Sequence, residues 1–587
     1  MMTWRTWLLA SQCLVASVLV ALPCRAQTST PAQTPAQAQL PPARYHIVIP
    51  GKGTAKKKTA APPATTQATP ESAATPALSA PDTTQTVSEP LPTAQTVQAG
   101  PQLDVIVPTT GGQLGGQALP DGTFAFKAVP FASPPVGKLR WTAPQDVAAW
   151  SGVRFSPDSA PACLQLSYGW NAAASERSSE DCLYLEIRTA SLNHTARKPV
   201  MVFIHGGANR AGAGDGTISS ALGRKDVVLV SLQYRLGVFG FLSHPALTAE
   251  QGGASGNYAL MDQIKALQWV RDNIASFGGD PDNVTIFGHS AGGQDVGLLM
   301  ASPSARGLFH KAIEESGTPQ FGFAPRTLAQ NEALGVELAE RFSKAPADGA
   351  KALADLRHAP AMALQTAGDT LQPHMEDTGF IWDAATVDGR VLPKSPADIF
   401  KAGEGAPVPL IIGVSARELT LADVSASLYG SIATRFGEQR GKVQRFYKLD
   451  VSKTPKPDEV LGDVTMQVST DIMLRCPSDW MARQATRNGQ TAYLYQLDVD
   501  ADPKGTVHHG SELAFVFNER PKGVKSDRWP PLMDYWVQFA TTGDPNGKSR
   551  DDWPAYGHKG RYIEFTKKGG KTHDGLRADM CALLDQP

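Results

Sequence analysis

Long apolar runs mark the strands that the sequence predicts. They lie at 198–207, 226–237, 283–287, 408–414 and 491–497. Each run is rich in β-branched and other large apolar residues and has few polar interruptions. Uninterrupted runs of this kind are typical of strands in a sheet that is covered on both faces. We therefore expect these segments to be buried strands.

An amphipathic helix is predicted between the second and third runs, at about 259–276. Its apolar positions recur three or four residues apart, and the helix is expected to end at the pair Gly278–Gly279. Strands that alternate with helices predict βαβ units and a mostly parallel sheet. Ligands bind at the carboxyl ends of the strands in such sheets, so functional residues are expected there.

The first hundred residues have a different composition. Arg5, the apolar run 8–22 and small residues around Ala26 predict a secretory signal peptide over 1–26. The alternative is an uncleaved anchor, although the run is short for a membrane span. Residues 27–101 are rich in Ala, Pro, Thr and Gln and contain eight charged residues and one aromatic, so they predict a disordered linker. The remaining region, 102–587, is expected to form a single large domain.

Charge and cysteine usage exclude several classes of function. Lys plus Arg is 55 and Asp plus Glu is 56, a balance that argues against nucleic-acid binding. No apolar run after the signal peptide is long enough for a transmembrane anchor. Four cysteines remain after cleavage, which allows three pairings in an oxidising compartment. Without a CxxC or His-rich cluster, no metal site is expected.

A candidate nucleophile follows the strand predicted at 283–287. The segment GHSAGG, residues 288–293, leads from this strand into an apolar helix. The small residues Gly288 and Gly292 permit a sharp strand–turn–helix geometry in which Ser290 stands clear of the sheet. The helix N-terminus also favours negative charge beside it. The pattern predicts a nucleophilic Ser290, with an ordinary glycine-rich turn as the alternative.

A nucleophilic serine needs a base and an acid that orients the base. In folds of this kind the order along the chain is serine, acid, histidine. Glu418 follows the run 408–414 and is placed at the carboxyl end of that strand, with Asp423 as the rival acid. His509 is favoured over His508 as the base because a glycine follows it late in the chain. The glycine-rich loop HGGA, 205–208, is the candidate source of oxyanion N–H donors, and a plain turn is its alternative.

Several longer segments resemble signatures of the type-B carboxylesterases, which share their fold with cholinesterases and bacterial p-nitrobenzyl esterases. They are VPFASPPVGKLRW, SEDCLYL, FGGDPDNVTIFGHSAGG, AIEESG, HGSELAFVF and FATTGDPN, and the match spans about 104–581. The motifs are similar to those of the p-nitrobenzyl esterases in particular. The resemblance implies an α/β-hydrolase fold, with a central mostly parallel sheet flanked by helices and large insertions around an active-site gorge.

The resemblance also implies roles for individual residues. The nucleophile, acid and base would be Ser290, Glu418 and His509. The N–H donors to the oxyanion would be those of Gly207, Ala208 and Ala291. The cysteines would form two disulfides, Cys163–Cys182 and Cys476–Cys581.

Three residues depart from the family pattern. His289 precedes the nucleophile where the family usually has glutamate, Asn209 stands where an aromatic commonly follows the oxyanion loop, and Leu419 replaces a glycine after the acid. Without the glutamate charge, a choline ester is expected to be hydrolysed no better than its neutral analogue.

The sequence thus predicts an exported serine carboxylic-ester hydrolase, secreted or periplasmic, that acts on a small-molecule ester through an acyl-enzyme. It is expected to need no cofactor. Alternatives within the same fold are a feruloyl, polyester or fumonisin-type mycotoxin esterase, or a lipase. A non-catalytic adhesion module is the alternative of another class, but such relatives lose the serine or its partners, which are all present here.

Overall fold

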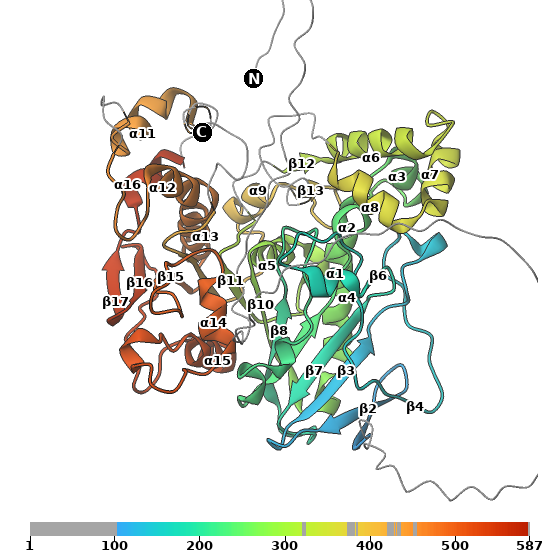
Figure 1. Cartoon of the computed structure of the whole chain (residues 1–587), viewed down its shortest axis with the longest axis horizontal. Helices are drawn as coiled ribbons and strands as arrows, with labels where there is room; N and C mark the ends of the chain where they lie inside the picture. Colours follow the sequence, from blue (N-terminus) through green and yellow to red (C-terminus); the bar gives the residue numbers. More distant parts are fainter. Residues whose placement is uncertain are drawn as a thin grey trace, which may run out of the picture. The chain divides into compact units, whose positions relative to one another are not determined.

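A central sheet of thirteen strands runs through the part of the chain that this computed structural model describes (Figure 1). The structure describes residues 103–319, 325–371, 382, 385–419, 428, 430, 432, 436–449 and 455–584. The predicted signal peptide, the predicted linker and Asp423 therefore lie outside the described residues. The strands follow one another across the sheet in the order β1 (Val105–Pro108), β2 (Gln113–Ala118), β3 (Phe124–Pro130), β7 (Tyr184–Thr189), β9 (Val228–Leu232), β8 (Lys198–Ile204), β10 (Gly279–His289), β11 (Lys311–Glu315), β14 (Leu410–Ser415), β15 (Ala492–Asp498), β16 (Arg561–Thr566) and β17 (Gly569–Asp574), and β4 (Val153–Arg154) pairs with β2.

The middle of the sheet is parallel and its edges are antiparallel. All neighbouring pairs from β9 across to β16 run parallel, which confirms the predicted mostly parallel sheet. The five apolar runs of the sequence coincide with β8, β9, β10, β14 and β15. The pairs from β1 through β3 and β7 to β9, and the pair β16–β17, are antiparallel. Edge strands such as β17, which reads GGKTHD, have too few apolar residues to give a strand pattern in the sequence.

Apolar side chains of the middle strands point alternately to two faces of the sheet. On β8, Val200, Val202 and Ile204 belong to one buried apolar cluster, whereas Met201 and Phe203 belong to another. Both clusters are covered by helices, which explains why these strands are apolar without alternation. The covering helices are α4 (Tyr258–Asn273) and α5 (Ala291–Ala301) on the first face and α14 (Ser511–Phe517) and α15 (Leu532–Thr542) on the second.

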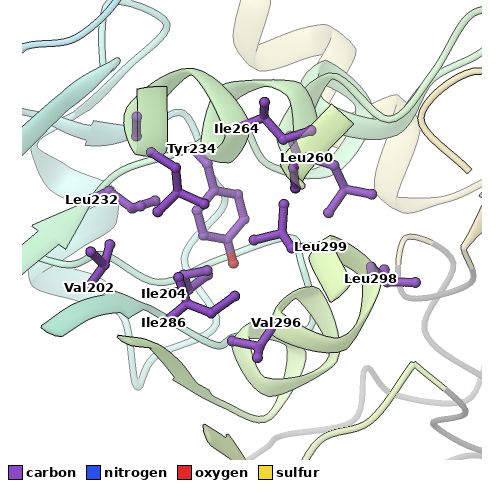
Figure 2. Packing of buried hydrophobic residues seen from close by; sticks show 14 of the residues in the cluster. Val202, Ile204, Leu232, Tyr234, Leu260, Ile264, Ile286, Val296, Leu298 and Leu299 are labelled. Atoms are coloured by element: carbon purple, nitrogen blue, oxygen red, sulfur yellow. The ribbon is translucent and has the colours of Figure 1, made fainter. Parts of the chain in front are cut away.

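Figure 2 shows the packing on the first face of the sheet. Side chains from the strands meet side chains of α4 and α5 in a layer with little or no solvent exposure. The labelled residues from the strand side are Val202, Ile204, Leu232, Tyr234 and Ile286, and those from the helices are Leu260, Ile264, Val296, Leu298 and Leu299. This layer fixes α5, and therefore the turn that precedes it, relative to the sheet.

The predicted helix at 259–276 is confirmed. Helix α4 spans Tyr258–Asn273 and continues as a 3₁₀ turn, η4, over Ile274–Phe277. Gly278 then has φ of +76°, a left-handed conformation that ends helices and favours glycine.

Two helical insertions lie in the chain between neighbouring parallel strands of the sheet. Between β11 and β14, helices α6 (Leu328–Phe342), α7 (Gly349–His358) and α8 (Ala361–Asp369) gather next to the short helices α2 (Gly237–Phe241) and α3 (Pro245–Glu250) (Figure 1). Between β14 and β15, one continuous helical stretch consists of α12 (Val464–Thr470), a π-helical turn η8 (Asp471–Arg475) and α13 (Cys476–Arg487).

The structure contains the two disulfides that the family resemblance implies. Cys163 pairs with Cys182, and Cys476 pairs with Cys581 of the C-terminal helix α16 (Ala578–Leu584). Among the described residues no helix is long and apolar enough to cross a bilayer, and no group of three or more His, Cys, Asp or Glu side chains is arranged to hold a metal ion.

Candidate active site

Ser290 lies on a sharp turn between β10 and α5. Its φ of 60° and ψ of −127° fall in a region that a residue with a side chain adopts only under strain. The backbone N–H of Ser290 donates to the carbonyl oxygen of Glu315 on β11 at 2.8 Å, which holds the turn against the sheet. A Cβ atom at Gly292 would overlap the carbonyl oxygen of Ile204, so a larger residue there would push α5 away from β8. The sequence-predicted turn is therefore present and tightly packed.

The three sequence-predicted side chains meet in a hydrogen-bonded chain. Ser290 Oγ lies 2.8 Å from His509 Nε2, and His509 Nδ1 lies 2.6 Å from Glu418 Oε2. The Glu418 side chain is fully buried and that of His509 is 9% exposed. His509 lies on the loop before α14, and Glu418 lies three residues beyond β14. The rival base, His508, points elsewhere, since its half-exposed side chain lies 3.1 Å from Asp500.

The glycine-rich loop after β8 packs directly against this turn. A Cβ atom at Gly206 would come within 3.0 Å of Ser290 Cβ. The next three residues, Gly207, Ala208 and Asn209, have φ of 117°, 54° and 53°. Successive backbone N–H groups in a turn conformation can form an anion-binding concavity. Ala291, the first residue of α5, adds a further N–H that has no partner within the helix.

Comparison with known proteins identifies the family. The model of the carboxylesterase family matches residues 103–584. Liver carboxylesterase 1 of Oryctolagus cuniculus is 32% identical over 534 residues, covering 80% of this chain and 91% of the relative. The chain belongs to the carboxylesterase family. It is a carboxylic ester hydrolase, and the sequence-based interpretation as a carboxylesterase is confirmed.

Solved structures of similar proteins confirm the α/β-hydrolase fold of this carboxylesterase. A PNB esterase matches with a TM-score of 0.68 and 28% identity, covering 82% of this chain and 99% of that chain. A carboxylesterase of Geobacillus stearothermophilus matches with a TM-score of 0.66 and 30% identity, covering 82% of this chain and all of that chain.

A second buried carboxyl, that of Glu512, lies close to Glu418. Ser316 Oγ lies 2.8 Å from Glu418 Oε1 and 2.5 Å from Glu512 Oε1. Burial, and then the charge of Glu418, raise the pKa of Glu512, which favours its neutral form. Sequence reasoning missed Ser316 and Glu512. Both lie inside the family-like segments AIEESG and HGSELAFVF, but their spacing from Glu418 gives no sign that the side chains meet.

His289, the residue before Ser290, is buried, and its surroundings favour the neutral ring. Burial, and then the charges of His509 and His508, hold the pKa of His289 well below its usual value. The His289 and His509 rings pack with centroids 4.6 Å apart, and His289 Nε2 lies 3.8 Å from Glu512 Oε1. The side chain that replaces the usual glutamate therefore brings no negative charge to the site.

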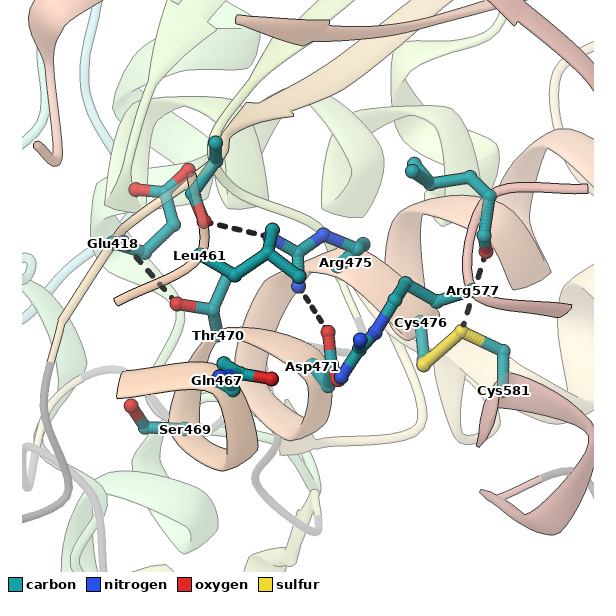
Figure 3. A network of polar contacts seen from close by, with 12 residues as sticks. Glu418, Leu461, Gln467, Ser469, Thr470, Asp471, Arg475, Cys476, Arg577 and Cys581 are labelled. Atoms are coloured by element: carbon teal, nitrogen blue, oxygen red, sulfur yellow. Dashed lines mark hydrogen bonds and ion pairs between the residues drawn. A yellow bond between two sulfur atoms is a disulfide. The ribbon is translucent and has the colours of Figure 1, made fainter. Parts of the chain in front are cut away.

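The loop that carries Glu418 is held by the helical stretch before Cys476 (Figure 3). The Glu418 side chain accepts a hydrogen bond from the Ser415 N–H at 2.6 Å. The backbone N–H of Glu418 donates to Thr470 Oγ1 at 3.2 Å. Ser469 Oγ donates to the carbonyl oxygen of Leu419 at 2.5 Å. Leu419, the residue that departs from the family pattern, thus has its turn fixed from α12.

A buried charge network extends this support to the C-terminus of the chain. Arg475 is fully buried, forms an ion pair with Asp471 and donates to the carbonyl oxygen of Ala416 at 2.7 Å. Asp471 also accepts from Arg577 Nη2 at 2.7 Å, and Arg577 lies just before α16 (Figure 3). Through these contacts the loop that carries Glu418, the π-helical turn and the Cys476–Cys581 disulfide are connected.

Proposed function

We propose that this carboxylesterase is an exported serine esterase that hydrolyses small-molecule carboxylic esters through an acyl-enzyme. The observation that carries the proposal is the chain of hydrogen bonds from Ser290 through His509 to Glu418. A serine on a strained turn, a histidine within hydrogen-bond reach and a carboxylate on the far ring nitrogen are the parts of a nucleophilic hydrolase.

In the proposed first step, His509 Nε2 takes the Ser290 hydroxyl proton while Oγ attacks the ester carbonyl carbon. Glu418 accepts the Nδ1–H, which fixes the tautomer that leaves Nε2 free to act as the base, and its charge stabilises the imidazolium that forms. The alcohol then leaves with the proton from His509. Water repeats the cycle on the acyl-enzyme and releases the carboxylic acid.

The negative charge that develops on the carbonyl oxygen needs donors that are in place before the reaction. We assign this role to the backbone N–H groups of Gly207, Ala208 and Ala291. Their place on the loop and the helix that flank Ser290 supports the assignment. Such donors contribute mainly in the transition state, so they raise kcat more than they lower KM.

Replacing the nucleophile tests this mechanism. Ser290→Ala should lower kcat for p-nitrophenyl butyrate by roughly 10⁴- to 10⁶-fold with an unchanged melting temperature, because only the nucleophile is lost. Ser302→Ala is the matched control, since Ser302 is a buried serine at the opposite end of α5. Near-normal turnover by Ser290→Ala would contradict the mechanism.

We further propose that residues 1–26 are a cleaved signal peptide, that 27–101 form a linker and that 102–587 form the catalytic domain. The two disulfides support export, because disulfides persist in oxidising compartments. Cell fractionation and N-terminal sequencing test the proposal: a mature chain that begins at Gln27 outside the cytoplasm is expected. A deletion of 27–101 should leave kcat/KM unchanged, and a large loss on deletion would show that these residues support the domain.

A further inference from the structure

Asn209, at the end of the proposed oxyanion loop, is held by its side chain as well as by its backbone. The residue is 1% exposed and has φ of 53°, directly after Ala208 with φ of 54°. Its Oδ1 lies 3.3 Å from the Tyr234 hydroxyl, and its carbonyl oxygen accepts from the Gly237 N–H at 2.7 Å. Its Nδ2 donates to Asp295 Oδ1 at 3.2 Å. An aromatic residue, which the family commonly has here, could not form these side-chain bonds.

Asp295 lies on α5, the helix whose N-terminus carries Ser290 and Ala291, and it has no solvent exposure. Its Oδ2 accepts a hydrogen bond from Gln263 Nε2 on α4 at 2.6 Å. In the described structure, the two side chains that hydrogen-bond to Asp295, those of Asn209 and Gln263, are thus neutral amides. Burial raises the pKa of Asp295 to about 7. A carboxyl buried without a cation is costly, so its presence calls for a specific use.

The Asn209–Asp295 bond joins the two elements that supply the proposed oxyanion donors. Gly207 and Ala208 lie on the loop after β8, whereas Ala291 lies on α5, in the same helix as Asp295. We propose that Asp295 is a positioning residue that, through Asn209, fixes the oxyanion loop relative to the nucleophile helix. This inference rests on the proposed role of the loop in the reaction.

The proposal predicts a defect that is confined to the transition state. If Asn209 loses its partner, the left-handed turn at 208–209 relaxes and the N–H groups move away from the developing oxyanion. Loss of a whole donor typically costs 10²- to 10³-fold in kcat, so a displaced loop should cost about 10- to 100-fold. KM should change by less than about threefold, because the loop binds the ester less strongly before attack.

Four variants test the contact from both sides. Asp295→Ala and Asn209→Ala each remove the bond, and their double variant should lose no more than the worse single variant, because one interaction is shared. Asp295→Asn should retain kcat within about threefold. Its side-chain oxygen can still accept from Asn209, and its NH₂ can meet Gln263 Oε1, a buried atom without a hydrogen-bond partner in the described structure.

Asp388→Ala is the matched control for the loss of a buried acid. Asp388 is 4% exposed, burial raises its pKa, and it accepts hydrogen bonds from the backbone N–H groups of Arg390 and Leu392, outside the site. The control should lower the melting temperature without a selective loss of kcat. If Asp295→Ala yields no folded protein, Asn209→Ala still tests the same bond from the loop side.

The inhibition constant of a trifluoromethyl ketone distinguishes a positioning role of Asp295 from a purely structural one. The ketone forms a tetrahedral oxyanion on the nucleophile, so its inhibition constant reports the oxyanion site directly. We expect that constant to rise in Asp295→Ala and Asn209→Ala by the same factor as kcat/KM falls, and to stay near wild type in Asp295→Asn and Asp388→Ala. An unchanged inhibition constant in Asp295→Ala, or losses that multiply in the double variant, would overturn the inference.

Stoichiometric labelling by a fluorophosphonate separates this inference from the proposed function. Labelling of Ser290 in the wild type, with slower labelling in Asp295→Ala, is expected when both hold. Labelled wild type with an unaffected Asp295→Ala rejects only the role of Asp295. A wild type that is active yet unlabelled at Ser290 rejects the proposed mechanism itself, and the role of Asp295 with it.

Discussion

The nucleophile and the acid of the proposed triad are held in different ways. Ser290 sits between a strand and a helix whose apolar side chains form the core in Figure 2, and its neighbour Gly292 touches backbone atoms of β8. Glu418 sits on a loop that is held by polar contacts from Thr470 and Arg475, fifty residues or more further along the chain. Steric packing fixes one side of the site, and a long-range polar network fixes the other.

This difference sets how each side should respond to change. Close packing leaves no room for an added methyl group, whereas a hydrogen-bond network tolerates a change of shape but not the loss of a buried partner. Activity should therefore respond to volume changes on the nucleophile side and to polar changes on the acid side.

The largest effect is expected when the acid itself loses its charge. Glu418→Gln should lower kcat by roughly 10³- to 10⁴-fold, because His509 is then free to adopt the wrong tautomer. Steady-state kinetics on a p-nitrophenyl ester measure this loss. Asp423→Asn is the comparison, and a greater loss in Asp423→Asn would mean that the acid is misassigned.

A single added methyl group next to Ser290 should lower the activity strongly. Gly292→Ala places a Cβ atom against the carbonyl oxygen of Ile204, so α5 and Ser290 must shift. A displacement of about 1 Å costs about 10²-fold in kcat. Gly349→Ala, at the first position of α7, is the control, because its Cβ would have only an ordinary contact of 3.4 Å with Ala246. Equal activity of the two variants would contradict the packing argument.

The polar network on the acid side should transmit a smaller effect. Arg577→Met removes both hydrogen bonds from Arg577 to Asp471. We expect kcat to fall by about tenfold with little change in KM, because the acid loop loses only indirect support. Arg154→Met serves as the control, since Arg154 stacks on Trp150 at β4, at the opposite end of the sheet order. Parallel losses in both variants would show that the network has no special link to Glu418.

The free energy of unfolding should depend on pH because of the buried carboxyl of Asp295. The pKa of this carboxyl is raised from 3.8 to about 7, first by burial, so the folded state binds a proton that the unfolded chain has already released. The stability that the protonated Asp295 contributes is fully present below pH 3.8 and is lost as the pH rises through about 7. Each pKa unit is worth about 1.4 kcal/mol. Urea unfolding measures this difference. As the pH rises from 5 to 8, the free energy of unfolding of Asp295→Asn should increase relative to that of the wild type. If the two free energies change with pH in parallel, the raised pKa of Asp295 is contradicted.

The smallest effect is expected from a cationic substrate. Trp170 lies beside the oxyanion loop, since a Cβ atom at Gly207 would be 3.1 Å from its Cη2 atom, so its indole could face a cation. The neutral His289, however, adds no negative charge next to Ser290. A choline ester should therefore have the same kcat/KM as its 3,3-dimethylbutyl analogue. An advantage above about tenfold, or ~1.4 kcal/mol, would contradict this expectation.

The sequence predicts the nucleophile side far better than the acid side. The turn around Ser290 depends on neighbours in sequence, Gly288 and Gly292, so a short motif suffices to predict it. The apolar runs likewise predict the parallel strands, because burial on both faces leaves a pattern in each strand separately. The contacts of Ser316 with Glu418 and Glu512 could not be predicted, because they join residues 102 and 196 positions apart in the chain. The contact of Glu418 with Thr470, 52 residues further along, could not be predicted for the same reason.

The same reason explains why Asp295 escapes sequence analysis. A lone acid in an apolar helix gives no indication that it meets Asn209, which lies 86 residues earlier in the chain. The antiparallel strands near the ends of the sheet escape for another reason. Short and partly polar segments such as QLGGQA become strands only because a neighbouring strand pairs with them.

The most direct test of the proposed mechanism is to trap the covalent intermediate. The protein is incubated with a slowly deacylating ester at low pH, quenched, digested and analysed by peptide mass spectrometry. We predict one acyl group per chain, on the peptide that contains Ser290, and none in Ser290→Ala. Full esterase activity with no acyl adduct, or with an adduct on another residue, would contradict the proposed mechanism.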